Sequence, residues 1–367
     1  MFHYFYVTFF KPIAFRFDPE LVHDKMSQFG HFLGRFKLGR WITKLLFSST
    51  QNEILKQEIQ GVVFKNPVGL SAGFDKNAKL MNILPYIDFG FEEIGSVTMY
   101  PYAGNPKPRL YRLKKSKALV VYYGLMNDGV KTIGKRIKKA LKTDMVLGVS
   151  IAKTNSDKTA KEEDGIMDYY HCLKYLVNHN IGQYYTINIS CPNTFGGEPF
   201  TTVDRLDRLL KKLSEVKIDK PIFIKMPINL DLKDYDGLLQ ICVKYIITGV
   251  IIGNLTKIKD PNLIKDEIPE HIKGGISGLP TQKLSDDLIS YTFKNYGDKL
   301  KIMGVGGIFS ADDAYEKIKR GASLLQLITG MIFEGPSLIK TINNELTAML
   351  KNDGYKSISE AVGAYHI

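Results

Sequence analysis

Cysteine is scarce in this sequence, and so are the motifs that usually mark metal, nucleotide or hydrolase sites. Only 3 of the 367 residues are cysteine, which excludes a disulfide framework and predicts a reducing, intracellular compartment. No zinc-type cysteine spacing occurs, and the 7 histidines show no HxxxH pattern, so no metal site is expected. The sequence also lacks GxSxG, GxxxxGK[ST] and GxGxxG at a strand–helix start, which counts against serine hydrolase, P-loop and Rossmann chemistry.

Long apolar runs are missing as well. None reaches the roughly 18 residues that a membrane-spanning helix needs. The start, MFHYFYVTFFKPIAFRF, has neither the basic leader nor the small-residue cleavage site of a signal peptide, so we expect a chain that neither spans a membrane nor is exported. What the sequence does have is positive charge: 50 Lys and Arg against 38 Asp and Glu give +12, which favours anionic partners such as phosphate groups, a membrane surface or nucleic acid.

The first sixty or so residues differ from the rest of the chain in composition and in predicted structure. A helix is predicted to begin at Asp18, with proline at its first helical position. The apolar spacing that follows is interrupted by Gly30 and Gly34, which predicts two short helices. Around Trp41, large apolar side chains alternate with cations, a pattern typical of an amphipathic element in a membrane interface. A helical cap packed on the main domain is the alternative.

The remainder alternates short β-rich runs with helical patterns. Strand–helix–strand repeated eight times predicts an α/β fold of the (β/α)8 TIM barrel type rather than an open doubly wound sheet. We assign residues 61–367 to this barrel, residues 1–60 to a small helical N-terminal extension, and the polar residues 154–168 to an inserted surface loop. The eight predicted strands are Val68–Leu70, Phe91–Val97, Met145–Ala152, Tyr184–Ser190, Ile222–Met226, Val250–Gly253, Lys301–Val305 and Leu324–Leu327.

Polar and glycine residues cluster at the carboxyl ends of these strands, where barrel enzymes carry their active sites. Glycines after the last two strands let backbone N–H groups approach a phosphate closely, although glycine can also merely ease a strand–helix turn. The residues that fit a phosphate cradle are Gly278, Gly304, Gly306, Gly307, Thr329 and Gly330.

Two lysines lie at or shortly after the carboxyl ends of predicted strands. A lysine in a barrel mouth is costly unless it meets an anion or a negatively charged ring, so Lys76 and Lys225 indicate a flavin or carboxylate partner. Lys153, in contrast, is interpreted as a solvated loop lysine.

One cysteine stands apart from the other two. Cys191 lies in the motif NISCPNT, where a thiol in a polar loop can act as a base or nucleophile. Cys172 and Cys242 are interpreted as inert small hydrophobes. The glycines of the following segment, 195–199, predict a loop that closes over the site.

Several blocks together resemble one family, the class 2, membrane-associated, quinone-dependent dihydroorotate dehydrogenases. They are FDPELVHD, FKNPVGLSAGFDKNAKL, FGFEEIGSV, GNPKPRLYRL, INISCPNT, GGISGLP, GVGGIFSADDAYEKIKRGASLLQL and EGPSLIKTI. The resemblance implies FMN in the barrel mouth and oxidation of dihydroorotate in pyrimidine biosynthesis. It also implies a quinone tunnel in the N-terminal extension, and peripheral attachment to the cytoplasmic side of an inner membrane.

The resemblance also implies roles for individual residues. Cys191 matches the catalytic base, a position that is usually serine in class 2. His23 and Arg112 match tunnel-lining positions. The substrate ligands implied are Lys76, Asn188, Asn193 and Asn254. The FMN ligands implied are Ala72, Gly73, Ser96, Asn188, Lys225, Gly278, Gly306, Gly307 and Thr329, and Gly330 joins them from the phosphate cradle.

Two positions depart from the family pattern and keep a second hypothesis open. Val121 and Leu255 stand where the family has asparagine and threonine, which favours a related, less polar cyclic substrate. If dihydroorotate nevertheless binds tightly, Asn127 or Tyr123 would hold it. A third hypothesis is a non-catalytic barrel that docks on a membrane or binds nucleic acid. The basic runs KKSK and KRIKK, however, have the character of solvated faces, so no nucleic-acid partner is expected.

Overall fold

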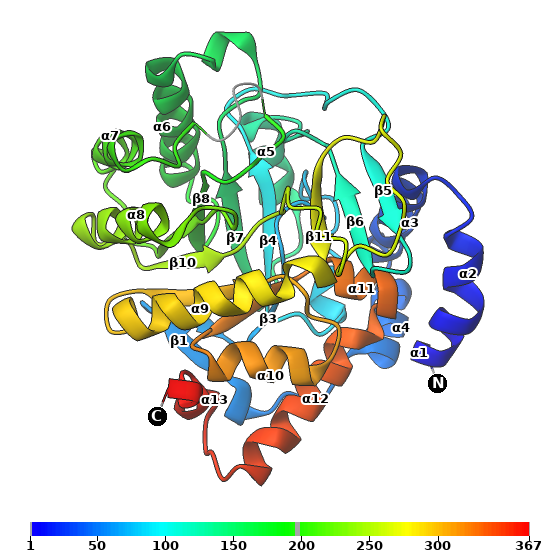
Figure 1. The fold of residues 1–367 in the computed structure, drawn as a ribbon. Helices are drawn as coiled ribbons and strands as arrows, with labels where there is room; N and C mark the ends of the chain where they lie inside the picture. Colours follow the sequence, from blue (N-terminus) through cyan, green and yellow to red (C-terminus); the bar gives the residue numbers. More distant parts are fainter. Residues whose placement is uncertain (1, 195–198, 367) are drawn as a thin grey trace.

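The computed structural model describes residues 2–194 and 199–366, and its centre is a closed barrel of parallel strands (Figure 1). Going round the barrel, the strand order is β10-β12-β13-β3-β4-β7-β8-β9, and β9 pairs with β10 to close it. The eight strands coincide with the eight predicted runs, so the predicted (β/α)8 barrel is confirmed. Their bounds are β3 Val68–Leu70, β4 Phe91–Val97, β7 Val146–Ile151, β8 Tyr184–Asn188, β9 Ile222–Lys225, β10 Gly249–Ile252, β12 Lys301–Val305 and β13 Leu324–Leu327.

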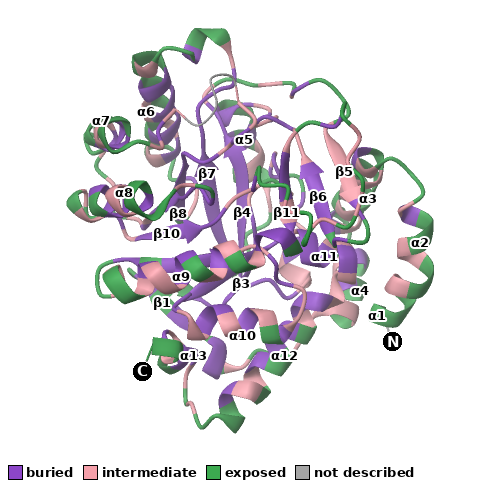
Figure 2. Ribbon diagram, in the orientation of Figure 1, coloured by how far each residue is buried: buried purple, intermediate pink, exposed green. Residues whose placement is uncertain are grey.

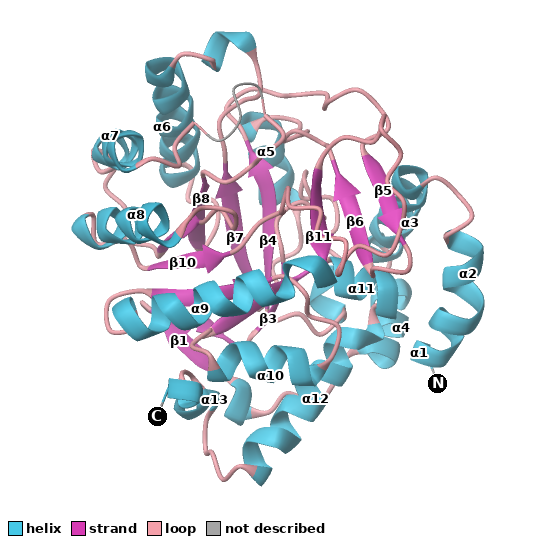
Figure 3. Cartoon of the chain, in the orientation of Figure 1, coloured by secondary structure: helices cyan, strands magenta, loops and turns pink. Residues whose placement is uncertain are grey.

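Amphipathic helices surround the barrel (Figure 3). In α7, leucines three and four residues apart, from Leu206 to Leu213, are buried while Lys211 and Lys212 lie near its end. At the start of α10, Ser310 accepts a hydrogen bond from the backbone N–H of Asp313 at 3.2 Å. The barrel helices are α5 Val130–Lys139, α6 Glu162–Asn178, α7 Val203–Leu213, α8 Leu232–Lys244, α9 Gln282–Tyr296, α10 Ala311–Lys319, α11 Thr329–Glu334, α12 Ser337–Asn352 and α13 Ile358–Ala361.

The amino end of the barrel is plugged. A hairpin of β1 (Gln57–Ile59) and β2 (Val62–Phe64) places Phe64 against Phe91 at 5.3 Å between ring centroids. These rings belong to a buried cluster inside the barrel. The barrel strands are coloured as buried in Figure 2. Because side chains fill this end, a ligand that enters the barrel has room at the carboxyl ends of the strands. The hairpin crosses the proposed division at residue 60, which stays a proposal.

The N-terminal segment is helical and lies along one side of the barrel (Figure 1). Asp18 caps α3 by accepting from the backbone N–H of Leu21 at 2.8 Å, as predicted. The expected break into two helices is wrong, since α3 runs unbroken through Gly30 and Gly34. A Cβ at Gly34 would lie 3.1 Å from the backbone of Asn82, so this glycine permits close packing rather than ending the helix. The elements are α1 Phe2–Phe5, η1 Tyr6–Phe10, α2 Lys11–Ala14, α3 Pro19–Arg35 and α4 Lys37–Phe47.

The surface loop expected at 154–168 is shorter than predicted: residues 154–161 lie outside α-helices, but the rest is helical. A short 3-10 turn, η4 (Asp157–Thr159), is followed by α6, which begins at Glu162. The acidic residues that suggested a loop form the first turn of this helix, where its dipole favours negative charge. The predicted closing loop at 195–199 lies outside the described residues except for Pro199.

A small antiparallel sheet, absent from the sequence prediction, covers part of the barrel mouth. It consists of β5 (Leu110–Leu113), β6 (Ala118–Val121) and β11 (Gly275–Gly278), in the order β11-β6-β5. The basic run KKSK forms the turn between β5 and β6. The remaining short 3-10 elements are η2 Glu53–Leu55, η3 Leu84–Tyr86, η5 Leu279–Thr281 and η6 Ala364–His366.

Candidate functional site

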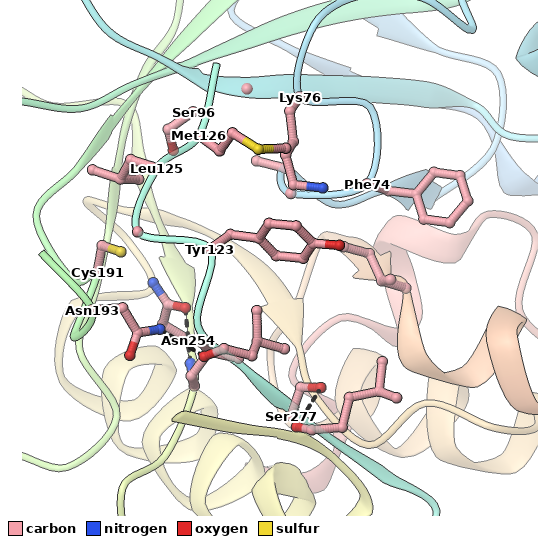
Figure 4. Close-up of a pocket in the computed structure, with 18 of the residues that line it drawn as sticks. Phe74, Lys76, Ser96, Tyr123, Leu125, Met126, Cys191, Asn193, Asn254 and Ser277 are labelled. Carbon is pink, nitrogen blue, oxygen red and sulfur yellow. Dashed lines mark hydrogen bonds between the residues drawn. The ribbon is translucent and has the colours of Figure 1, made fainter. Parts of the chain in front are cut away.

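A cavity of about 180 Å³ opens at the carboxyl ends of the barrel strands, and we call it the main cavity. Side chains reach it from the strand ends, from the small sheet and from α3 of the N-terminal segment (Figure 4). Most of the predicted site residues therefore converge on one place. Those that line it are His23, Ala72, Gly73, Lys76, Ser96, Asn188, Cys191, Asn193, Lys225, Asn254 and Thr329.

A second cavity adjoins the first and is lined by four of the predicted glycines, Gly278, Gly306, Gly307 and Gly330; we call it the glycine cavity. Gly304, predicted with them, lines neither cavity, because it lies inside β12 and a Cβ there would face Ile289, Ala322 and Lys317. Gly306 and Gly307 have φ angles of 112° and 71°, which side chains other than glycine rarely adopt. A Cβ at Gly330 would collide with the carbonyl oxygen of Ile308. The bare backbone leaves N–H groups accessible, which suits a phosphate group.

Three polar residues of the glycine cavity were missed by the sequence prediction or given no role in it. Ser277 Oγ lies 2.9 Å from Thr329 Oγ1, and Thr281 Oγ1 donates to the carbonyl of Gly278 at 2.8 Å. Ser71 Oγ accepts from Lys225 Nζ at 3.2 Å. The motif GGISGLP contains Ser277, and Thr281 follows it directly, but hydroxyl residues beside glycines are too common for the pattern alone to single them out.

Lys225 lies between the two cavities and lines both. Its side chain is buried inside the barrel, and burial lowers the pKa of its ammonium group, while the charges of Glu93 and Cys191 oppose this effect. A buried cation at the junction of the cavities favours a ligand that brings negative charge to this point.

Asn188 anchors a chain of short polar contacts at the ends of β4, β7 and β8. Its amide Nδ2 donates to Ser96 Oγ at 2.8 Å, and Ser96 Oγ lies 2.8 Å from Ser150 Oγ. Its Oδ1 accepts from both the backbone N–H and the hydroxyl of Ser190 at 3.2 Å. Ser150, which the sequence analysis did not select, therefore helps to hold a residue expected to touch cofactor and substrate.

The loop that carries Cys191 is held by amides. Asn193 Nδ2 donates to the carbonyl of Val121 at 2.8 Å, and the carbonyl of Asn193 accepts from Asn105 Nδ2 at 2.9 Å. Asn254 Nδ2 donates to the backbone oxygen and the hydroxyl of Ser190 at 2.9 and 2.8 Å. These bonds fix the loop against β6 and β10, so Cys191 keeps its place on the cavity wall. Asn105 was missed, although it lies in the motif GNPKPR.

Lys76 enters the main cavity from the loop after β3. Its Nζ lies 4.0 Å from the centre of the Tyr123 ring, the arrangement of a cation–π contact (Figure 4). Burial lowers the pKa of Lys76 to about 8, and the negative charges of Asp24, Asp75 and Glu20 oppose the shift. A buried ammonium group that stays protonated near neutral pH is a suitable partner for a carboxylate.

His23 lies at the end of the main cavity that faces the N-terminal segment. Its ring packs edge-on against Phe74 with 4.9 Å between centroids. Burial and the nearby charge of Lys76 lower its pKa to about 3, so the imidazole is neutral under ordinary conditions.

Arg112, the other predicted tunnel residue, does not line either cavity. Its Nη1 donates to the carbonyl of Phe17 at 2.8 Å, and its guanidinium lies 4.5 Å from the ring centre of Phe15. It therefore joins β5 to the connection between α2 and α3.

Three interpretations of single residues are tested directly. Lys153 is not a solvated loop lysine: it is buried and donates to the carbonyl of Thr159 at 3.0 Å, because α6 and η4 cover it. Cys172 and Cys242 are confirmed as buried core residues, and burial raises the pKa of both thiols. Within residues 2–194 and 199–366, no group of three His, Cys, Asp or Glu side chains is arranged to hold a metal ion.

The walls of the main cavity around Cys191 are largely apolar. Val121 and Leu255 both line it, as do Leu125 and Met126. Asn127 is not available to a ligand, contrary to one of our expectations: its amide bonds Thr98, Leu125 and Gly129 on all sides, and it is buried. Tyr123, the other residue expected there, does line the cavity.

Comparison with known proteins finds relatives that match most of the chain. A family model described as dihydroorotate dehydrogenase matches residues 54–350. A dihydroorotate dehydrogenase (quinone) from Sulfurimonas denitrificans is 39% identical over 313 residues, covering 85% of this chain and 86% of that protein. The protein of the same name from Nautilia profundicola is 37% identical and covers 96% of this chain and 95% of its own length.

Solved structures share the fold. The crystal structure of DHODH from Eimeria tenella in complex with ferulenol superposes with a TM-score of 0.82 at 26% identity, covering 95% of this chain and 96% of that one. The ligand-free form of the same protein gives a TM-score of 0.83 at 27% identity, with 95% and 100% covered.

Proposed function

Because the chain belongs to the dihydroorotate dehydrogenase family, we propose that it oxidises dihydroorotate to orotate and passes the electrons to a quinone. The observation that carries this proposal is the meeting of Cys191, Lys76 and the amides of Asn188, Asn193 and Asn254 in one cavity beside a glycine-lined one. A proton acceptor, a cation and amides on one side of a phosphate-sized cradle suit a flat anionic substrate next to a nucleotide cofactor.

FMN is the flavin that these residues fit. The glycine cavity suits its single phosphate, and its wall needs glycine: a Cβ at Gly278, Gly307 or Gly330 would collide with neighbouring residues and displace the backbone that forms this wall. Ala72, Gly73, Ser96, Asn188 and Lys225 would border the ring system, and the charge of Lys225 would favour an electron-rich ring. When bound, the flavin accepts a hydride from the substrate and later gives up two electrons.

Each protein group has a defined part in the substrate step. The Lys76 ammonium binds the substrate carboxylate, and the three asparagines orient the ring amides. The Cys191 thiolate removes the proton from the carbon next to the ring carbonyl, while hydride leaves the neighbouring carbon. The C–C bond between these two carbons becomes C=C, and the thiol later returns its proton to solvent. Reduction of the quinone to quinol takes up the two electrons that the substrate has lost, which balances the oxidation.

We place the protein at the cytoplasmic surface of an inner membrane, bound through its N-terminal segment. Along the described chain, no helix is both long and apolar enough to cross a membrane. The segment nevertheless exposes many large apolar side chains beside cations, as an interfacial element does. The exposed apolar residues are Phe2, Tyr4, Phe5, Phe9, Ile13, Phe17, Leu21, Met26, Phe29, Phe32, Phe36, Leu38, Trp41, Ile42 and Leu45. A quinone would enter the main cavity beside His23, which lines it, whereas Arg112 would act from outside the cavity through the connection between α2 and α3.

One experiment tests the proposed reaction. The purified protein should show a flavin spectrum, and dihydroorotate should bleach it under anaerobic conditions, after which a soluble quinone should restore the colour. A protein that binds FMN but is not reduced by dihydroorotate would contradict the substrate assignment. A protein that cannot take up FMN would contradict the enzyme class.

The apolar wall supports a second candidate, a flavin oxidoreductase for a less polar cyclic substrate. Val121 and Leu255 present aliphatic groups to the cavity and can form no side-chain hydrogen bond with a ring amide. A panel of cyclic amides, tested beside dihydroorotate in the same anaerobic reduction, separates the two candidates by their relative reduction rates.

A further inference from the structure

Tyr123 is in contact with two cations. On one face its ring meets Lys76 Nζ at 4.0 Å, and Arg109 Cζ lies 5.6 Å from the same ring centre. The ring is buried, and its hydroxyl has no hydrogen-bond partner among the described residues. The contacts of Tyr123 with Lys76 and Arg109 are therefore made by its aromatic ring and not by its hydroxyl.

Arg109 is itself held by the N-terminal segment. Its Nη2 donates to Glu20 Oε1 at 2.6 Å and its Nε donates to Glu20 Oε2 at 3.3 Å, a two-point contact with a carboxylate that is only 4% exposed. Glu20 lies in the first turn of α3, and Arg109 immediately precedes β5. A third bond, from Arg109 Nη1 to the carbonyl of Ala103 at 2.8 Å, fixes the guanidinium from the loop before β5.

We propose that Tyr123 is a positioning residue for Lys76, and that Glu20 acts through Arg109 to hold the Tyr123 ring in place. The N-terminal segment would thereby contribute to substrate binding as well as to the quinone side. This inference rests on the proposed function, because it takes Lys76 as the residue that binds the substrate carboxylate.

The physical argument is that the ring stabilises a buried ammonium group. Burial works against the charged form of Lys76, and the negative face of an aromatic ring supplies part of the compensation. The charged and titratable groups around Lys76 are Asp75 beside it, Glu20, His23 and Asp24 on α3, and Arg109 before β5. Removing the ring leaves the carboxylates as compensation, so a smaller fraction of Lys76 is protonated at a given pH.

The test compares Tyr123→Leu with Tyr123→Phe in the FMN-loaded enzyme. Tyr123→Leu should raise KM for dihydroorotate about 3- to 30-fold with kcat within about twofold, and should move the basic limb of kcat/KM to lower pH. Tyr123→Phe, which keeps the ring, should restore both the KM and the pH profile. Calorimetric titration with orotate should show the same order of affinities without turnover.

Glu20→Gln tests the connection to α3, with Glu58→Gln on the exposed side of β1 as the matched control. Glu20→Gln should raise KM about 2- to 5-fold and shift the basic limb in the same direction, because it removes a charge and weakens the hold on Arg109. Glu58→Gln should behave as the wild type. Because the charge of Glu20 also acts on Lys76 directly, this pair tests only the link to α3. Should Tyr123→Leu fail to fold, Tyr123→Met replaces it in the comparison with Tyr123→Phe.

The outcomes separate this inference from the proposed function. If the wild type is reduced by dihydroorotate but Tyr123→Leu or Glu20→Gln keeps its KM and pH profile, the positioning role is wrong. It is also wrong if Tyr123→Phe behaves like Tyr123→Leu. If the wild type itself is not reduced by dihydroorotate, the proposed function fails first.

Discussion

Cys191 is the residue on which the proposed chemistry depends most directly. Replacing it with alanine removes the proton acceptor but leaves the glycine cavity and Lys225 intact, so FMN should remain bound. Flavin reduction by dihydroorotate should slow by about 10² to 10⁴, the usual cost of losing a general base. Stopped-flow absorbance measures this rate. Cys242→Ala, at a buried thiol outside the cavities, should keep the rate, and an unchanged rate in Cys191→Ala would refute the assignment.

Val121 and Leu255 decide how many hydrogen bonds the substrate can form. If dihydroorotate is bound without partners at these positions, each missing buried hydrogen bond weakens binding by about 1–3 kcal/mol. The double variant Val121→Asn with Leu255→Thr should then raise kcat/KM for dihydroorotate, by roughly tenfold for each 1.4 kcal/mol recovered. A wild type with micromolar KM that the double substitution impairs would instead mean that Lys76 and the three asparagines hold the substrate without help from these positions.

At the scale of elements, the small sheet over the barrel mouth joins the main cavity to the glycine cavity. Gly278 ends β11 with φ of 91°, and a Cβ there would collide with the carbonyl oxygen of Lys117 beside β6. Gly278→Ala should therefore displace β11 from β6 and lower the FMN content of the purified protein. Gly354→Ala, with φ of 83° but open space around it, should cost about 1 kcal/mol of stability and retain FMN. Full FMN occupancy in Gly278→Ala would contradict this account.

The helices before Ser48 form an element that can be removed without cutting into the barrel. The β1–β2 hairpin must stay, because Phe64 fills the amino end of the barrel. A variant that begins at Ser48 should bind FMN and reduce a soluble dye at saturating dihydroorotate, while quinone reduction and vesicle binding fall far more. Equal losses with dye and quinone in a folded, FMN-loaded variant would show that the segment is a structural cap.

For the whole molecule, His23 makes stability depend on pH where the N-terminal segment meets the barrel. Its pKa is about 3 in the folded protein against an ordinary value of 6.5, so the unfolded chain binds more protons between these limits. The contribution of neutral His23 to stability is therefore fully present above about pH 6.5 and is lost as the pH falls toward 3. Between pH 7 and pH 5 this group should cost about 1–2 kcal/mol of unfolding free energy.

Chemical denaturation at pH 7 and pH 5 measures the loss of unfolding free energy. His23→Gln should remove the part of this loss that His23 causes, because the amide does not titrate. Equal losses of unfolding free energy in the variant and the wild type would show that another group is responsible. His179→Gln, at an exposed histidine on the far end of α6, is a suitable control.

The sequence by itself determined the barrel and most of its site. Eight apolar runs with helices between them specify strands and crossovers locally, and a barrel then brings every strand end to one face. Cys191, Lys76 and the glycines of the last two strands could be selected because each lies at or shortly after the carboxyl end of such a strand. The helix cap at Asp18 could also be predicted from neighbouring residues, since capping involves only Asp18 and the first turn of the helix that follows it.

Only the tertiary structure decided the features that depend on contacts between distant segments. The pairing of β11 with β6, the packing of α3 on Asn82, and the burial of Lys153 beneath η4 and α6 leave no local pattern in the residues concerned. The same holds for the contact of Tyr123 with Lys76 and Arg109, in which Glu20 takes part from a position 89 residues before Arg109. Periodicity reports which face of an element is apolar, whereas folding decides which other element covers it.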